Sequence, residues 1–495
     1  MATAQQTASQ SLRIAQEKSR ALPLPVFFYL IMVVTPFQFH LGPVLLNGVR
    51  AFLLIMIVPL TVNLLKGKYG RLIAADFLFF LHMAWAAIAL SMNNPDRTIQ
   101  FIGSNAVEFL GGYILARAYI RSSEVLMAVW KMLFAIVILS LPLAVFEAVT
   151  ARPILIELIN KLPSIHSVLN VPMEARMGLD RAQVMFSHPI HYGLFCSVTF
   201  ALCFVGMKAE WGNFRRYLTT ALMCAGVFLS LSSGALLPVF LQIGLIIWAA
   251  IFRKLNARWV LLISLIVLCY IVIDLLSNRS PIRVFMSYAT FSAHNAYWRG
   301  LIFEYGMQNV IDNPIFGIGL NDWVRPAWMY TNTVDNFWLL LAMQFGIPGL
   351  ILAVLGYTEV LLRIGLRRLD PKTTIWRLRR AYMFSFVGLT FTLSTVHIWT
   401  NIYSWVFFML GSGVWMIFAD TNSQSDRDAG AVETERGNVN LRRTGGHNVV
   451  LARSHGAPSN RAGPNEAKDK PNEAPEPKNP YTRFPKSAGN NDSLP

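Results

Sequence analysis

The chain has 495 residues, of which 54% are hydrophobic and 14% charged, and its mean hydropathy is +0.44. Soluble globular proteins carry about 25% charged residues, so this composition excludes that class and predicts a polytopic membrane protein. The net charge of +16 does not indicate nucleic-acid binding, because the basic residues fall mainly in short loops between apolar segments.

The apolar runs predict an all-α membrane fold of about twelve spans. The polar, basic stretch before Leu24 has no small-residue cleavage site after it, so residues 1–23 are expected to stay as a cytoplasmic N-terminal segment ahead of a membrane domain at 24–419. The spans are expected at roughly 24–39, 46–65, 72–92, 99–118, 125–148, 189–208, 216–233, 235–252, 258–276, 334–364, 380–397 and 400–419.

The connecting segments differ in charge and length. Short loops rich in Lys and Arg alternate along the chain, and the positive-inside rule then places both termini in the cytoplasm. Two long loops, at about 150–188 and 277–333, are expected outside. After Ala419 the composition shifts to Asn, Gly, Pro, Arg and Glu, which predicts a disordered cytoplasmic tail over 420–495.

The second long loop contains an amphipathic pattern. Trp298, Leu301, Ile302 and Tyr305 are spaced i, i+3, i+4 and i+7, which predicts a helix that lies along the membrane surface or caps the bundle.

Both long loops carry arginines against the positive-inside trend. Long loops translocate whatever their charge, so Arg152, Arg279 and Arg325 are interpreted first as surface residues. Arg181 precedes the sixth span by about two helical turns, and Arg299 lies on the predicted amphipathic helix. An arginine stays ionised and can bind oxygens bidentately, so these two at a membrane surface suit a diphosphate.

Other polar residues leave alternatives open. Asp76 and Glu108 lie within spans, where they serve either a contact that stabilises the bundle or a substrate role. His188 and His191 are spaced i, i+3 without acidic or cysteine partners, which favours a helix start over a zinc site. The cysteines are interpreted as packing residues; they are Cys196, Cys203, Cys224 and Cys269.

Asp335 and Asn336 stand where a polar loop turns into an apolar span, which is interrupted further on by Gly-Ile-Pro-Gly at 346–349. One interpretation is an ordinary helix cap followed by a Pro kink. The other is a carboxylate at the membrane face that orients or deprotonates a hydroxyl. Backbone groups freed by the break must be satisfied by protein or water, so the break should face the bundle or a cavity.

In this order the segments resemble the O-antigen ligase and O-antigen polymerase superfamily of bacterial membrane glycosyltransferases. The matching residues are Arg181, Phe186, His188 and Pro189; Ser232, Ser233 and Gly234; Arg299, Phe303, Pro314, Gly317 and Gly319; and Asn336, Leu339, Gly346, Ile347, Gly349 and Leu350. Two positions depart from the family pattern, since Asp335 replaces the usual His before Asn and Ser233 replaces the usual Arg of a Ser-Arg-Gly turn.

The resemblance implies a glycosyltransferase in the bacterial inner membrane that uses undecaprenyl-diphosphate-linked oligosaccharides on the periplasmic face, without metal or cofactor. A polymerase of exopolysaccharide or O-antigen is preferred to a ligase that transfers glycan to lipid A–core. Regulators of chain length or export proteins are possible partners, and nucleic acid is not. The implied catalytic residues are Asp335, Arg299 and Arg181, and the implied substrate-binding residues are Arg176, His188, His191, Asn336, Arg283 and Arg325.

A different class, a transporter or flippase of the lipid-linked glycan, predicts charged residues along the bundle, paired broken helices and an internal repeat. The sequence has few intramembrane charges, one clear break and no repeat, so the enzyme is favoured.

Overall fold

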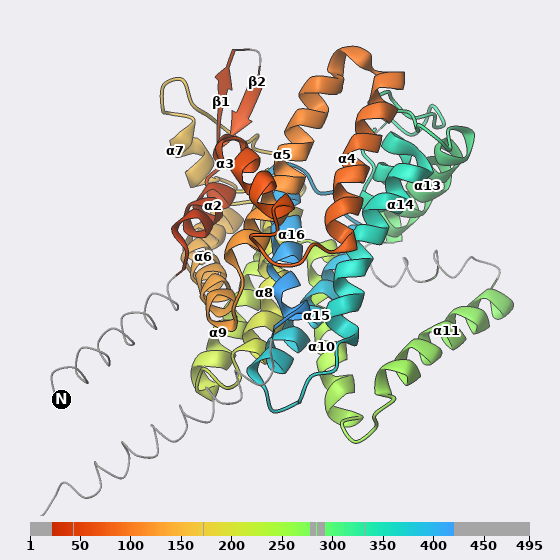
Figure 1. Ribbon diagram of the computed structural model, residues 1–495. Coiled ribbons are helices and arrows are strands. Elements are labelled where there is room, and N and C mark those ends of the chain that lie inside the picture. The colour runs from red at the N-terminus through yellow and green to blue at the C-terminus, as the bar shows by residue number, and fades with distance from the viewer. Residues whose placement is uncertain are drawn as a thin grey trace, which may run out of the picture. The chain divides into compact units, whose positions relative to one another are not determined.

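The computed structural model describes residues 22–42, 44–171, 173–277, 284, 293–330 and 332–419. These residues form a helical bundle with a small sheet (Figure 1). Arg279, Arg283 and the predicted tail from 420 onward lie outside the described residues, as does the N-terminal segment up to 21.

Each predicted span corresponds to a helix, with bounds that differ by a few residues at most positions. The helices are α2 (Leu24–Val34), α3 (Gly48–Leu65), α4 (Ala74–Asn93), α5 (Pro95–Tyr119), α6 (Ser123–Thr150), α8 (Pro189–Ala201) continued by a π-helical turn (Leu202–Gly206), α9 (Asn213–Leu229), α10 (Ser233–Ile251), α11 (Arg258–Leu276), α14 (Phe337–Leu366), α15 (Thr374–Leu393) and α16 (Thr400–Ser412) followed by a 3-10 turn (Val414–Ile417).

Seven of the described helices are long and apolar enough to cross a membrane, and α2 is a shorter apolar helix. The chain is therefore a multi-pass membrane protein by length and composition, while the count of twelve spans stays a prediction. No residue of α11 is buried by protein. A helix that is apolar on all sides and uncovered by protein suits contact with lipid.

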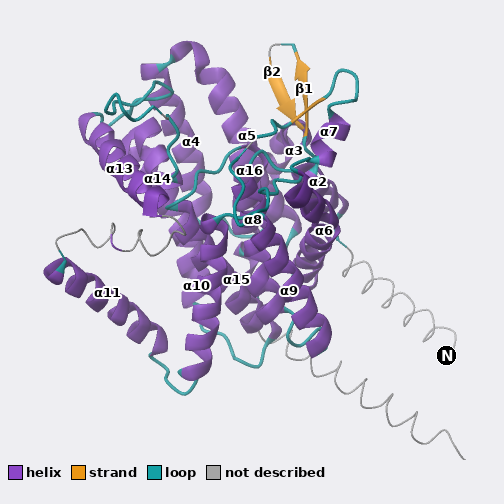
Figure 2. Ribbon diagram, turned by 180° about the vertical axis from the view of Figure 1, so that it is seen from behind, coloured by secondary structure: helices purple, strands orange, loops and turns teal. Residues whose placement is uncertain are grey.

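The first predicted span, 24–39, is longer than the helix found there. The helix ends at Val34, and the chain continues into β1 (Phe37–Leu41), which turns back as β2 (Val44–Asn47). β1 and β2 lie side by side in Figure 2. β1 also pairs with β3 (His166–Ser167) from the first long loop, so the sheet order is β2-β1-β3. The all-α prediction missed this sheet because a short apolar strand directly after an apolar helix reads as one continuous run.

The two long loops hold further helices. α7 (Ile154–Ile159) lies in the first, and α13 (Ala293–Asp312) occupies the position of the predicted amphipathic helix. The apolar face of α13 packs on α14 and the loop before it, with Ile302 and Val310 in one cluster with Leu339 and Met343. Gly306 allows this approach, because a Cβ there would lie 2.8 Å from Leu339 Cδ2.

Small residues bring the central helices close together, as is common where membrane helices pack. On α5, a Cβ at Gly112 would lie 2.5 Å from the Ser404 carbonyl oxygen of α16. On α14, a Cβ at Gly356 would lie 2.4 Å from the Phe79 ring of α4. These contacts fix α5 against α16 and α4 against α14, which surround the cavities described below.

The two acids singled out from the sequence, Asp76 and Glu108, are both paired with arginine. Asp76 accepts hydrogen bonds from the Ile73 amide and from the Tyr113 hydroxyl at 2.7 Å, and it forms an ion pair with Arg117 at 3.2 Å. Glu108 is paired with Arg50 at 2.7 Å. For Asp76 these contacts favour the interpretation that it stabilises the bundle, whereas Glu108 also faces a cavity.

Candidate functional site

A cavity of about 580 Å³ lies among the loop before α8, the α9–α10 turn, α13, the start of α14 and the loop before α16. We call it the arginine cavity. It brings together five of the predicted site residues: Arg176, Arg181, His188, Arg299 and Asp335. Its other lining residues are Met173, Ile190, Ser232, Ser233, Trp298, Ile302, Asn332, Thr333, Val334, Leu340, Val396, His397 and Trp399.

Two of the arginines are held by the turn between α9 and α10. Arg176 donates from Nη1 to the Leu231 carbonyl at 2.8 Å, and Arg181 donates from Nε to the Ser230 carbonyl at 3.4 Å. Leu231 itself has a φ of 45°, a backbone conformation that turns its carbonyl toward the loop. The turn between α9 and α10 therefore supports both arginines.

The loop that carries Arg181 is tied to α6 through Glu147. Its two carboxylate oxygens accept from the amides of Gln183 and Val184, each at 2.9 Å. Val184 has a φ of 51°, which is unfavourable for a β-branched residue and persists only where the surroundings enforce it. Glu147 thus fixes the backbone at residues 183–184. It is a positioning residue for Arg181, which precedes this point in the chain, and for His188, which follows it.

The third arginine, Arg299, reaches the cavity from α13. Gly234 leaves room for it, since a Cβ at Gly234 would lie 3.7 Å from Arg299 Nη2 and 2.9 Å from Val396. Asp335 is the neighbouring acid, from the last loop residues before α14. Among the described residues its carboxylate accepts no hydrogen bond, so both oxygens can receive one from a ligand.

Burial and charge crowding shape the ionisation of these groups. Burial, with the charges of Arg176 and Arg299, lowers the pKa of Arg181 to about 10. Burial also lowers the pKa of Arg299, although Asp335 opposes this. Burial raises the pKa of Asp335, although Arg299 opposes this. Three cations thus face one acid, and this excess positive charge suits an anionic group such as a diphosphate.

The histidines form an aromatic cluster around Trp399. His191 lies with its ring centroid 4.0 Å from that of Trp399, and its Nε2 is 3.3 Å from the His397 carbonyl oxygen. His188 caps α8 by accepting the Ile190 amide at its Nδ1. Burial lowers the pKa of His188 to about 4 and that of His397 to about 4, so both rings are neutral at pH 7. His188 lines the cavity, while His191 does not line it and packs against Trp399 in its wall.

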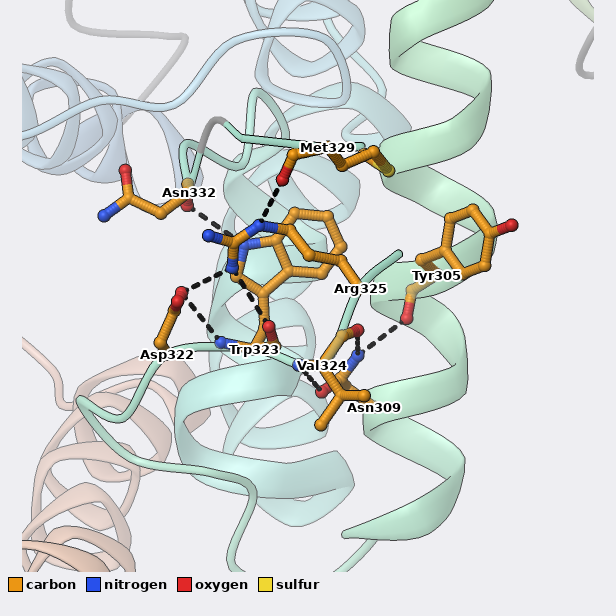
Figure 3. Close-up of polar contacts among 8 residues, drawn as sticks. All are labelled: Tyr305, Asn309, Asp322, Trp323, Val324, Arg325, Met329 and Asn332. Carbon is orange, nitrogen blue, oxygen red and sulfur yellow. Dashed lines mark hydrogen bonds and ion pairs between the residues drawn. The ribbon is translucent and has the colours of Figure 1, made fainter. Parts of the chain in front are cut away.

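The remaining predicted residues lie elsewhere. Arg325 is fixed within its own loop, where it donates to Asp322 at 2.6 Å and to the Met329 carbonyl at 2.8 Å (Figure 3). Asn336 caps α14 by accepting the Leu339 amide at 3.0 Å. Both therefore serve the local structure and do not line the cavity. Arg152 is an exposed residue paired with Glu157, and Arg283 is outside the described residues.

The Gly-Ile-Pro-Gly break is satisfied by protein, as predicted. Gly346 has a φ of 72° and interrupts α14. The carbonyls freed there accept hydrogen bonds from two other segments. Met343 accepts the Ile318 amide, from the loop after α13, at 2.7 Å, and Phe345 accepts the Trp85 indole, from α4, at 2.9 Å. The loop after α13 is thus interlocked with α14, which holds Arg299 and Asp335 in one place.

Two cavity residues were missed from the sequence. His397 and Trp399 were placed in or beside predicted spans, but α15 ends at Leu393 and α16 starts at Thr400. The segment between them, Ser394 to Trp399, enters the cavity wall instead. The sequence does contain a signal for this loop, since His397 and Trp399 stand two residues apart at the junction of two apolar runs.

The comparison with protein families agrees with this arrangement. Residues 218–354 match the family model for O-Antigen ligase. The resemblance to the O-antigen ligase and polymerase superfamily is thereby confirmed over this segment, and it supports a membrane enzyme of that type. The match contains Ser233, Arg299 and Asp335, whereas Arg181 and His397 lie outside it. No curated protein matches the chain.

Proposed function

We propose that the protein polymerises glycan repeats linked to undecaprenyl diphosphate on the periplasmic face of the bacterial inner membrane, with both termini in the cytoplasm. The observation that carries the proposal is the arginine cavity, where, among the described lining residues, Arg176, Arg181 and Arg299 face one acid, Asp335. A lipid diphosphate matches this excess of positive charge, and guanidinium groups bind its oxygens in pairs.

In the proposed reaction an acceptor hydroxyl attacks the anomeric carbon of the donor sugar. The new C–O bond forms as the bond from that carbon to the diphosphate oxygen breaks, and the hydroxyl proton passes to Asp335. Arg181 and Arg299 stabilise the negative charge that grows on the leaving diphosphate, an electrostatic contribution that is often the largest in such sites. The raised pKa of Asp335 makes it a better proton acceptor than an ordinary carboxylate.

Polymerisation is preferred to ligation because of the two departures from the family pattern. Asp335 stands at the usual His position and Ser233 at the usual Arg position, and both line the cavity. The resemblance implies that such departures favour an exopolysaccharide-type member over a lipopolysaccharide ligase. The acceptor is then a second lipid-linked repeat, and regulators of chain length or export are the expected partners.

The test is transfer by the purified full-length protein in detergent, supplied with lipid-diphosphate-linked repeat units alone. We expect a ladder of products longer than one repeat, which disappears with Arg299→Ala and persists with Arg152→Ala, a variant of an exposed arginine. If no ladder forms, a lipid A–core acceptor is added. A single transfer to that acceptor would identify a ligase, and absence of product with both acceptors would favour a flippase of the same glycan.

A further inference from the structure

A second cavity, also of about 580 Å³, adjoins the arginine cavity and has no role in the reaction described so far. It lies between α4, α5 and the N-terminal parts of α14 and α16. The two cavities share a wall made of Leu340, His397 and Trp399. Whatever occupies the second cavity is therefore separated from the arginine cavity by these three side chains.

One wall of the second cavity is a polar row on α5. Arg97, Gln100 and Ser104 recur at intervals of three and four residues and so share one helix face. Asn105 follows Ser104 directly, and all four line the cavity. Among the described residues, none forms a hydrogen bond with the side chains of Gln100, Ser104 or Asn105. These side chains are therefore available to form hydrogen bonds with a polar ligand.

The facing walls are aromatic. Phe101 lies within the polar row, and Phe337, Tyr403 and Trp399 contribute from α14, α16 and the loop before α16. Phe337 and Tyr403 have ring centroids 6.1 Å apart. A concave site with mostly apolar walls and a few convergent polar groups has the composition of a ligand pocket.

These walls match a sugar better than a lipid chain or a second diphosphate. An acyl chain would leave the α5 amides unsatisfied, which carries a free-energy cost. A diphosphate would find less positive charge than in the arginine cavity, because Arg50 is paired with Glu108 at 2.7 Å and Arg97 is the other arginine of the wall. Sugar hydroxyls both donate and accept hydrogen bonds, as do Asn, Gln and Ser side chains, and the apolar faces of sugar rings pack on aromatic side chains.

We propose that the second cavity binds the glycan of the acceptor, with Gln100, Ser104 and Asn105 as its recognition residues. The shared wall of Leu340, His397 and Trp399 then separates the acceptor sugars from the donor diphosphate and leads the reacting hydroxyl toward Asp335. Glycan binding stands on the cavity itself, while the role of that glycan as acceptor rests on the proposed function.

The test uses the full-length protein in detergent and two probes. One is the repeat-unit oligosaccharide released by mild acid from lipid-linked intermediates of the native host, which lacks both lipid and diphosphate. The other is undecaprenyl diphosphate. Saturation-transfer NMR measures the dissociation constant of the oligosaccharide, and a competition experiment measures that of undecaprenyl diphosphate. Neither measurement depends on glycan transfer by the enzyme.

We expect the double variant Gln100→Leu, Asn105→Leu to weaken oligosaccharide binding by about 10- to 100-fold, since each amide contributes one or two hydrogen bonds. Its affinity for undecaprenyl diphosphate should stay within about twofold of wild type. Arg299→Ala should weaken the binding of undecaprenyl diphosphate and leave the affinity for the oligosaccharide within about twofold of wild type. The matched control Gln308→Leu removes an exposed amide that lines neither cavity and should leave both affinities unchanged.

Unchanged oligosaccharide affinity in the double variant overturns the proposal, and so does failure of the wild type to bind the oligosaccharide at about 10 mM. If the double variant loses both probes, Ser104→Trp replaces it, because this change fills the cavity from a single half-buried position. Oligosaccharide bound normally by that variant also overturns the proposal. Oligosaccharide binding without any transfer would retain the glycan site and reject the proposed function.

Discussion

Two groups of arginines in this protein differ in what surrounds them. Arg117 is 3% exposed and paired with Asp76, which is 2% exposed, and the Tyr113 hydroxyl completes the cluster within the packed helices. Arg181 and Arg299, with Arg176, instead surround a cavity of about 580 Å³ that contains one acid.

The pairing of these arginines indicates which of them stabilise the fold and which are available to bind a ligand. A buried charge needs a partner, and the pair of Asp76 and Arg117 provides it within the protein. Among the described residues, three arginines beside Asp335 leave positive charge without an acidic partner. Burial, together with the charges of neighbouring arginines, lowers the pKa of both Arg181 and Arg299. Such a site is most favourable when a ligand brings the missing negative charge.

The largest effect is expected at the paired site. Asp76→Leu leaves Arg117 buried without its acid and should lower the free energy of unfolding by about 3–5 kcal/mol. Denaturant titration in detergent measures it. The double variant Asp76→Leu, Arg117→Met should recover most of the loss, because no unpaired charge remains. Equal stability of Asp76→Leu and wild type would contradict the structural role.

Loss of a cavity arginine should reduce activity and leave stability intact, in contrast to loss of Asp76. Arg181→Gln should reduce the rate of glycan transfer by about 100- to 1000-fold, as removal of one preorganised donor to a transition state does. Its stability should equal or exceed that of wild type, because like charges are then less crowded. Arg152→Gln is the control, since Arg152 is exposed and paired with Glu157. A stability loss without a rate loss would make Arg181 a structural residue.

The acid of the cavity is tested by pH. Asp335→Asn should reduce transfer by about 100-fold if the carboxylate accepts the proton. The reaction needs the ionised form, and burial raises the pKa of this carboxyl. Wild-type activity should therefore fall as the pH drops through a value above about 3.9, the ordinary pKa of Asp. The pH–rate profile measures this, and an acidic limb that persists in Asp335→Asn would belong to another group.

A smaller effect is expected from the residue that holds the Arg181 loop. Glu147→Gln keeps one acceptor oxygen and replaces the other by a donor that faces an amide of Gln183 or Val184. We expect transfer to fall by about tenfold through poorer placement of Arg181. The affinity for undecaprenyl diphosphate should fall with it. Loss of stability alone, with transfer per folded molecule unchanged, would argue that Glu147 does not position the site.

Much of the fold could be predicted from the sequence, because membrane spans are defined by local composition. Runs such as 258–276 coincide with α11 at both ends. The β1–β2 strands could not be predicted in this way, since pairing of β1 with β3 joins residues far apart in the chain. Local composition also did not predict the loop at 394–399, because apolar runs flank it on both sides and its place in the cavity wall depends on distant segments.

The sequence by itself determined the membrane class, the two arginines worth testing, the acid at 335 and the family resemblance, because each depends on residue type and order. Only the tertiary structure decided which residues meet. It brought Arg176 to Arg181 and Arg299, fixed Arg325 within its own loop, and added His397 and the second cavity. Contacts between segments depend on how helices pack and where they end, which local composition does not specify.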